Sequence, residues 1–492
     1  MKYQNLLGLL LAATVLPASA QSFSAFTAGD IVVSVEGNGV YGAASGPYTD
    51  NQAAPLTLFE FSTTGTSGAS FAGSMVLPQT SSGSNWAISG EYGSSSEGTL
   101  QLSGNGQYLT IMGYGVNAAT FNANPTAYGT TVNDPTKPTA LGQSGSLTGQ
   151  SYIAVPRVVA LIGANGSVDT STALYGVFNG NNPRSVYTVD GSSFYVSGQG
   201  NSPDATGGVF YATRGSSTAT AITGLDTNSK SSSQDTRDVQ VHNGQLYVSV
   251  DSKEGSGNNR DFIGTLGSAG SLPTSLANSG NGPTQLSGFA SSNAGKLTVT
   301  AANENTVNAS VVGQTINLSP ENFFFASSSV LYVADSGAPK NNSGSSTLGD
   351  GGLQKWVNSK ADGTGTWTLE YTLSSGLNLV ANTSASGTTG LLGLTGEVVG
   401  GSVELFATNY TVGDIDQTYL FGITDSLAAT SLPSGETFSI LATAPADSNF
   451  KGVSLAPVPE PATYGMLVAG LGLLWLMIRR RAATISTVCA LG

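Results

Sequence analysis

The sequence predicts an all-β fold, a single β-propeller of about six or seven blades, followed by one C-terminal transmembrane helix. Short β-branched and aromatic runs bounded by Gly, Asn or Asp recur along the chain, as at Ile31–Val35, Leu56–Phe61 and Tyr108–Met112. No long segment of helical period separates these runs, which excludes folds built from βαβ units. A turn followed by a strand also repeats along the chain.

The repeated phrase is a tight Gly turn or loop followed by an aromatic and aliphatic strand. It occurs at Asn105–Thr110, Asp190–Ser197 and Asn243–Ser249, with a looser copy at Ser328–Val333. A spacing of roughly fifty to eighty residues over residues 21–456 predicts about six or seven four-stranded blades. A pair of β-sandwiches or a parallel β-helix is the alternative.

A propeller leaves no free sheet edge if its first and last strands pair. We expect the strand Ile31–Val35 to pair with strands near Phe438–Ala442 and Lys451–Leu455.

The N-terminus has the three parts of a secretory signal peptide over residues 1–20. Lys2 supplies the positive charge, Leu6–Leu16 the apolar core, and Ala18 and Ala20 the small-residue cleavage site. The mature chain is therefore expected to begin at Gln21 and to be exported.

The C-terminus combines an extended box, an apolar segment and a basic stop. Pro459 and Pro461 hold the backbone around Glu460 extended. The seventeen uncharged residues Ala462–Ile478 are near the lower limit for a membrane-spanning helix. The basic stop, Arg479, Arg480 and Arg481, predicts that the short tail 482–492 stays cytoplasmic.

This order of features resembles the PEP-CTERM sorting signal, here residues 457–481, which exosortase systems of Gram-negative bacteria read. The resemblance implies an exosortase-type processing enzyme as partner, and a membrane-anchored precursor delivered to the cell surface or to the extracellular matrix of a biofilm. The residues after the arginines, Ala482–Gly492, depart from the pattern, since such signals usually end soon after the basic cluster. A permanent C-terminal anchor or a buried helix is the alternative.

Nearly the whole mature chain resembles a family of secreted bacterial β-propeller modules of unknown activity. The family implies a single propeller domain, 21–456, and supplies no catalytic residues to transfer. The phrases that carry the resemblance are Phe26–Val33, Ser96–Ser103, Arg157–Ala160, Val168–Leu174, Gly352–Trp356 and Phe450–Pro457.

Composition excludes several classes of partner and site. Between the signal peptide and the arginines, 13 Lys and Arg face 30 Asp and Glu, a net charge of −17. So acidic a surface argues against a nucleic-acid partner. The only cysteine, Cys489, follows the arginines, so the exported part has no disulfide and no thiolate metal site.

Two motifs are better explained by turns than by chemistry. The G-x-G-x-x-G of Gly37–Gly42 is followed by the loop Ala43–Asp50, where a dinucleotide site needs a helix. His242 is the only histidine and precedes the turn Asn243–Gly244, and no G-x-S-x-G elbow exists. We expect a turn at the first and a surface histidine at the second, with no catalytic residue and no histidine-rich zinc site.

Carboxylates and aromatic rings are the remaining candidates for binding. Calcium is the one metal considered, held by carboxylates near strand ends, although turn-forming Asp explains the same residues: Asp235, Asp238, Asp251, Asp335 and Asp350. Trp86, Trp356 and Trp367 could stack on an extracellular polysaccharide, although strand packing also explains them.

The sequence therefore predicts a structural or binding role at the cell surface and no enzyme, since it contains no catalytic motif. Two alternatives remain: a secreted hydrolase or lyase with an acidic site in the propeller channel, and a calcium-stabilised adhesion module.

Overall fold

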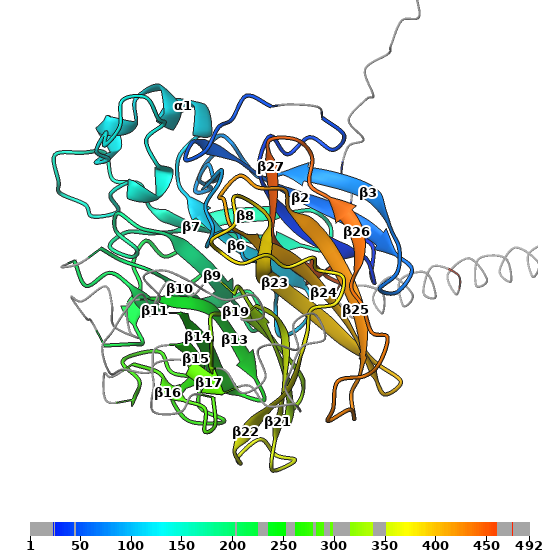
Figure 1. Cartoon of the computed structure of the whole chain (residues 1–492). Coiled ribbons are helices and arrows are strands. Elements are labelled where there is room, and N and C mark those ends of the chain that lie inside the picture. The colour runs from blue at the N-terminus through cyan, green and yellow to red at the C-terminus, as the bar shows by residue number, and fades with distance from the viewer. Residues whose placement is uncertain are drawn as a thin grey trace, which may run out of the picture.

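The computed structural model describes residues 23, 25–43, 46–201, 204–224, 235–251, 261–278, 282–289, 296–298, 315–337, 351–459 and Trp475. These residues form an all-β propeller whose strands are antiparallel within each sheet. The sheets follow one another in chain order, from the blue strands β2 and β3 through green to the orange strand β26, which lies beside β3 (Figure 1).

Four sheets of the described chain have four strands each. The first contains β9 (Pro183–Tyr187), β10 (Ser193–Gly198), β11 (Gly208–Thr213) and β12 (Thr220–Ala221). The second contains β13 (Thr236–His242), β14 (Gln245–Asp251), β15 (Asp261–Leu266) and β16 (Thr284–Gln285). The third contains β19 (Pro320–Ser327), β20 (Val330–Asp335), β21 (Gly352–Asn358) and β22 (Trp367–Leu373). The fourth contains β23 (Thr388–Val399), β24 (Ser402–Thr411), β25 (Tyr419–Ser426) and β26 (Ser439–Thr443).

A nine-stranded sheet holds both ends of the propeller. Its order is β27 (Ser448–Leu455), β1 (Ile31–Gly37), β2 (Ala53–Thr63), β4 (Ser89–Glu91), β6 (Tyr108–Tyr114), β7 (Arg157–Gly163) and β8 (Val168–Leu174). Strand β3 (Ala69–Val76) pairs with β2, and β5 (Gln101–Leu102) pairs with β6. A separate two-stranded sheet contains β17 (Lys296–Thr298) and β18 (Thr315–Asn317).

The expectation of six or seven separate four-stranded blades is corrected to four in the described residues. The reason is the short strand β4, which pairs with Ala53–Pro55 of β2 on one side and with Tyr114 of β6 on the other. It thereby joins the runs β27-β1-β2-β3 and β5-β6-β7-β8 into one continuous sheet.

The ring closes through the ends of the domain. Strand β1 pairs with β27, with Ile31 opposite Leu455 and Val33 opposite Val453, which confirms one of the two pairings expected for Ile31–Val35. The other is wrong, because the strand near Phe438–Ala442 is β26 and pairs with β25. The first strands of successive groups, β5, β9, β13, β19, β23 and β27, contact one another in turn and surround the centre.

The four repeated phrases occupy equivalent places. Each forms the turn and the strand that follows the first strand of its group: β6, β10, β14 and β20. The G-x-G-x-x-G segment also behaves as predicted, since β1 ends at Gly37 and a turn follows, with positive φ at Gly37, Gly39 and Gly42.

Helix is scarce in the described residues. The α-helix α1 (Ala118–Ala123) follows the cap Asn117, whose side-chain oxygen accepts the backbone N–H of Thr120 at 2.9 Å. The short 3-10 helices η1 (Pro125–Tyr128) and η2 (Leu141–Gln143) lie in the same long connection between β6 and β7. This connection forms a lobe beside the sheets (Figure 1).

Within the described chain, no helix combines the length and apolarity needed to cross a membrane. The predicted span Ala462–Ile478, apart from Trp475, lies outside the described residues. The same holds for Ala18, Ala20, Glu460, Pro461 and the arginines Arg479, Arg480 and Arg481.

Candidate functional site

Charged side chains from neighbouring sheets meet at the centre of the ring. Arg184, Arg237 and Glu321 are each the second residue of a first strand, in β9, β13 and β19. Arg237 Nη1 lies 3.1 Å from Glu321 Oε2, and Arg237 Nη2 lies 3.2 Å from Asp251 Oδ2. Asp235 pairs with Arg184 and approaches Arg237 Nε at 3.9 Å. We call these five residues the central ion cluster.

The central ion cluster is closed to solvent, since none of its residues is more than 5% exposed. Burial opposes the charged form of Arg237, but the carboxylates of Glu321 and Asp251 outweigh it and raise the pKa of Arg237. The arginine therefore stays charged and joins sheets that share no strand.

A second group of buried acids, Glu36 of β1, Glu91 of β4 and the nearby Glu97, lies beside Lys451 of β27. Lys451 Nζ is 3.9 Å from Glu36 Oε2, and Glu91 Oε2 accepts the backbone N–H of Gly142 at 2.5 Å. Glu97 accepts hydrogen bonds from the Tyr114 hydroxyl and from Asn182. Burial raises the pKa of Glu36, Glu91 and Glu97, and their mutual repulsion adds to the effect for Glu36 and Glu91.

The segment Ser94–Gly98 hydrogen-bonds to β27, to Asn182 and to β24. Lys451 Nζ donates to the carbonyl of Ser94, and Asn182 Nδ2 donates to Ser94 Oγ at 3.2 Å. Ser95 hydrogen-bonds Tyr410 of β24. At Gly452 a Cβ atom would lie 2.5 Å from the Gly98 carbonyl oxygen, so only glycine lets β27 approach this segment so closely.

Asp251 and Asp335, two of the carboxylates predicted as calcium ligands, accept hydrogen bonds from protein donors. Asp251 accepts the Ser319 hydroxyl at 2.8 Å, besides Arg237. Asp335 accepts the backbone N–H of Ser319 at 2.8 Å and the amide of Gln354 at 2.9 Å. In the part of the chain that the structure describes, no three His, Cys, Asp or Glu side chains are grouped to hold a metal ion. Asp350 lies outside the described residues.

Asp238 of β13 shows what burial does to a carboxyl group here. It accepts hydrogen bonds from Ser185 Oγ at 2.7 Å, Gln240 Nε2 at 2.6 Å and the amide of Gln101. Complete burial nevertheless raises the pKa of Asp238 to about 7.

The aromatic candidates pack inside the sheets. Trp356 is fully buried and stacks on Phe289 at 4.0 Å, and Trp367 is 3% exposed. Trp86 is half-buried against Tyr175. Trp356 and Trp367 therefore present no open ring for sugar stacking. His242 ends β13, as expected beside the turn, and is half-buried on Phe325 with ring centroids 4.4 Å apart.

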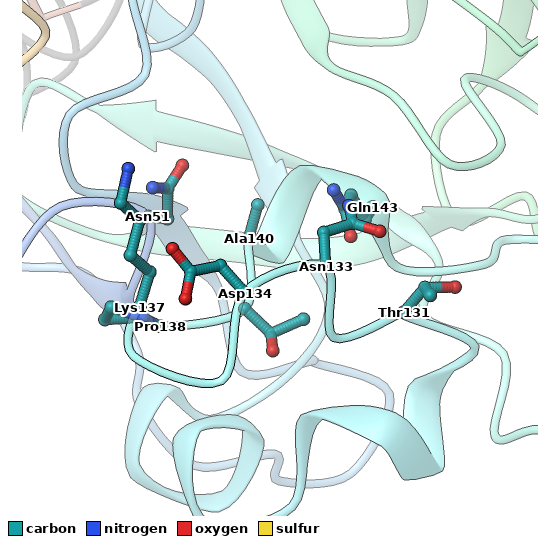
Figure 2. Close-up of a pocket in the computed structure, with 9 residues that line it drawn as sticks. Asn51, Thr131, Asn133, Asp134, Lys137, Pro138, Ala140 and Gln143 are labelled. Atoms are coloured by element: carbon teal, nitrogen blue, oxygen red, sulfur yellow. The ribbon is translucent and has the colours of Figure 1, made fainter.

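Open cavities lie at the loops of the described chain. Figure 2 shows Asn51, Asp134 and Lys137 at one end of a cavity of about 150 Å³ and Asn133 with Gln143 at the other. A cavity of about 340 Å³ lies at the loops of the last four-stranded sheet and is lined mainly by Asn378, Asp416, Gln417, Tyr419, Phe421 and Ile440. The second is within the range of about 300–1,000 Å³ that is usual for small-molecule sites.

The start of the predicted sorting signal is held on the propeller. The Val458 backbone N–H donates to the carbonyl of Gly106 at 2.8 Å. Val458 and Pro459 line a cavity of about 260 Å³ together with Gln107, Tyr108, Gly163, Ala164, Asn165 and Ser167.

Residues 457–481 match the family model described as the PEP-CTERM protein-sorting motif. The chain carries a PEP-CTERM sorting motif. The motif begins two residues after β27 ends and contains the box Pro459, Glu460 and Pro461. It implies recognition by an exosortase and export with sorting in a Gram-negative bacterium.

Among solved structures, the propeller is similar to the GH43_1 enzyme from Xanthomonas citri. The match covers 70% of this chain and 90% of that one, with 8% identity and a TM-score of 0.31. A likeness this distant carries no conclusion about activity. No curated protein sequence matches the chain.

Proposed function

We propose that this PEP-CTERM protein is an exported β-propeller with a structural or binding role at the cell surface or in the extracellular matrix. The segment Ala462–Ile478 serves as a temporary membrane anchor, and an exosortase-type enzyme processes the tail. The observation that carries the proposal is the match of residues 457–481 to the sorting motif, directly after the strand that closes the ring.

The closed centre supports a structural or binding role over catalysis. A hydrolase or lyase site needs carboxyl groups that face a substrate. The central carboxylates of Asp235, Asp251 and Glu321 are instead at most 5% exposed and paired with arginines.

The proposal predicts that Glu460→Ala leaves the propeller folded but blocks removal of the tail. The reason is that Glu460 is the only charged residue between the end of β27 and Arg479. Mass spectrometry of the C-terminus of the surface-released protein is the measurement. Wild type should end near Pro459–Pro461, whereas the variant should keep its arginines and stay in the membrane fraction.

The matched control is Glu397→Ala, which removes an exposed glutamate at the end of β23. It should be processed like wild type. An unchanged C-terminus and unchanged release in Glu460→Ala would refute the processing step, and an intact tail in wild type would indicate a permanent anchor.

We also propose that the fold needs no resident metal ion. The described candidate carboxylates already bond to arginine, serine, glutamine and backbone donors. Addition of EDTA should therefore leave the thermal midpoint of unfolding unchanged. A midpoint that falls with EDTA and returns with added calcium would support the calcium-stabilised adhesion module instead.

The cavity at Tyr419 is the place we propose for contact with a neutral extracellular polysaccharide. It combines aromatic rings with a carboxylate and two amides, and Asp416 is held in place by the backbone N–H groups of Gly387 at 3.0 Å and Gly413 at 2.9 Å. Hydroxyl groups suit such donors and acceptors, and sugar faces suit the rings. Calorimetric titration with neutral oligosaccharides should show saturable heat that Asn378→Ala reduces; no heat in wild type would refute this location.

A further inference from the structure

The N-terminal and C-terminal ends of the propeller are held at adjacent turns. The Phe26 backbone N–H donates to the carbonyl of Ala164 at 2.9 Å, and that of Val458 donates to Gly106 at 2.8 Å. The acceptors belong to adjacent turns, because Tyr108 and Gly163 are opposite each other where β6 pairs with β7. Both the signal-peptide side and the sorting-motif side of the chain therefore emerge at these turns.

These turns belong to one face of the ring. A turn joins the first strand to the second in each group, and the corresponding place between β27 and β1 holds the two chain ends. The turns are linked sideways: Asn105 N–H donates to Val189 O at 2.9 Å, and Asn243 Nδ2 donates to Ser328 Oγ at 2.9 Å. We call this the turn face, made of residues 103–107, 164–167, 188–192, 243–244, 328–329 and 400–401.

The turn face is close to neutral, whereas the opposite face is acidic. Asp190 is the only charged residue in these six turns, and the other turns between third and fourth strands on the same face add Arg214, Lys360, Asp362 and Glu436, for a net charge of −1. The connections on the other side, between second and third strands or between groups, carry six aspartates and one lysine in the described residues: Asp50, Asp134, Lys137, Asp204, Asp414, Asp416 and Asp447. The turn face also exposes aliphatic side chains at its tips, with Val189 40% and Val399 48% exposed.

The tether between the propeller and the predicted anchor is short. Four residue steps separate Val458 from Ala462, and a fully extended chain covers at most about 14 Å over that length. The polar layer on each side of a bilayer is about 5–8 Å thick. An inserted anchor therefore leaves room for little more than the lipid headgroups between Val458 and the hydrocarbon core.

We propose that in the anchored precursor the turn face lies against the phospholipid surface and the acidic loops point away from it. This rests on the proposed insertion of Ala462–Ile478. A nearly neutral face with aliphatic tips can approach headgroups without the repulsion that the acidic face would meet at anionic lipids. The box Pro459–Pro461 is then confined between the propeller and the membrane, within reach of a membrane-embedded enzyme.

The test uses single cysteines in the full-length precursor, in a Cys489→Ser background without other cysteines. Val189→Cys and Val399→Cys report on the turn face. Val132→Cys and Ile415→Cys, at positions 47% and 56% exposed on the opposite face, are the matched controls. Each variant carries a fluorophore and is reconstituted into phosphatidylethanolamine–phosphatidylglycerol vesicles that contain a headgroup-labelled quencher lipid.

Quenching should be several-fold stronger at positions 189 and 399 than at 132 and 415. Equal quenching in protein that floats with the vesicles, or stronger quenching at the controls, would overturn the orientation. Protein that does not float would instead refute the proposed anchor. A twelve-residue Gly/Ser insertion after Val458 adds a flexible spacer of roughly 20 Å, and it should remove the difference between faces while flotation persists; an unchanged difference would contradict the tether argument.

Discussion

Replacing Arg237 with alanine is expected to lower the free energy of unfolding by about 3–5 kcal/mol, the usual cost of removing one partner from a buried ion pair. The guanidinium is 2% exposed and bonds to Glu321 and Asp251 on two different sheets. Its loss leaves two buried carboxylates without their counter-charge, and water cannot reach them. Urea unfolding of the released protein, followed by tryptophan fluorescence, measures the change.

The matched control is Arg214→Ala, which removes the partner of Asp169 at 2.6 Å. This pair is 47% and 25% exposed, so its loss should cost about 0–1 kcal/mol. A loss below 1 kcal/mol for Arg237→Ala as well would show that water enters the centre. The central ion cluster would then not be a dry structural centre, and an open acidic site in the propeller channel would again be a candidate.

The strands were predictable because their signal is local. The phrases Asn105–Thr110 and Asn243–Ser249 each contain a complete hairpin turn and the strand after it, so their positions in β6 and β14 follow from a few residues. The pairing of Ile31–Val35 with Lys451–Leu455 needed one further idea, that a ring must close, and it is confirmed.

The division into sheets was not predictable from such signals. Strand β4 has only three residues, Ser89–Glu91, without β-branched or aromatic character, yet it joins two groups of strands into one sheet. The partner of the strand near Phe438 was wrong for a related reason. Its apolar residues fit either β1 or β25, and only the order of strands in space decides between them.

The sequence predicts only part of the central ion cluster. The sequence places Asp235 and Asp251 near strand ends as candidate ligands, but it does not indicate their partners. Arg237 and Glu321 are 84 residues apart, and nothing local indicates that they meet. The missed signal is positional: Arg184 and Arg237 are each the second residue of a first strand, in a chain where only 10% of residues are charged. Equivalent positions in a ring of repeats converge, so charges at them should pair.

The stability of the propeller is expected to fall as the pH rises from about 4 to above 7, and Asp238→Asn should weaken this dependence. Burial raises the pKa of Asp238 from its ordinary value of 3.8 to about 7. The folded state therefore keeps a proton between these values that the unfolded state releases, so the contribution is complete below pH 3.8 and is lost as the pH rises through 7. At 1.36 kcal/mol per pH unit, this amounts to at most about 4 kcal/mol.

Urea unfolding of wild type and variant between pH 4 and 8 gives the comparison. Asparagine retains one acceptor oxygen for Ser185 and cannot ionise. The free energy of unfolding of the variant should therefore rise relative to that of wild type as the pH rises. Asp134→Asn is the control, since the pKa of that exposed carboxyl is lowered by hydrogen bonds from Thr136 and its loss cannot produce the same trend. Glu36, Glu91 and Glu97 also have raised pKa values, so a weaker decline should remain in Asp238→Asn. Parallel curves for wild type and Asp238→Asn would show that Asp238 is ionised in the folded protein, which requires water at β13 and an interior less dry than its packing indicates.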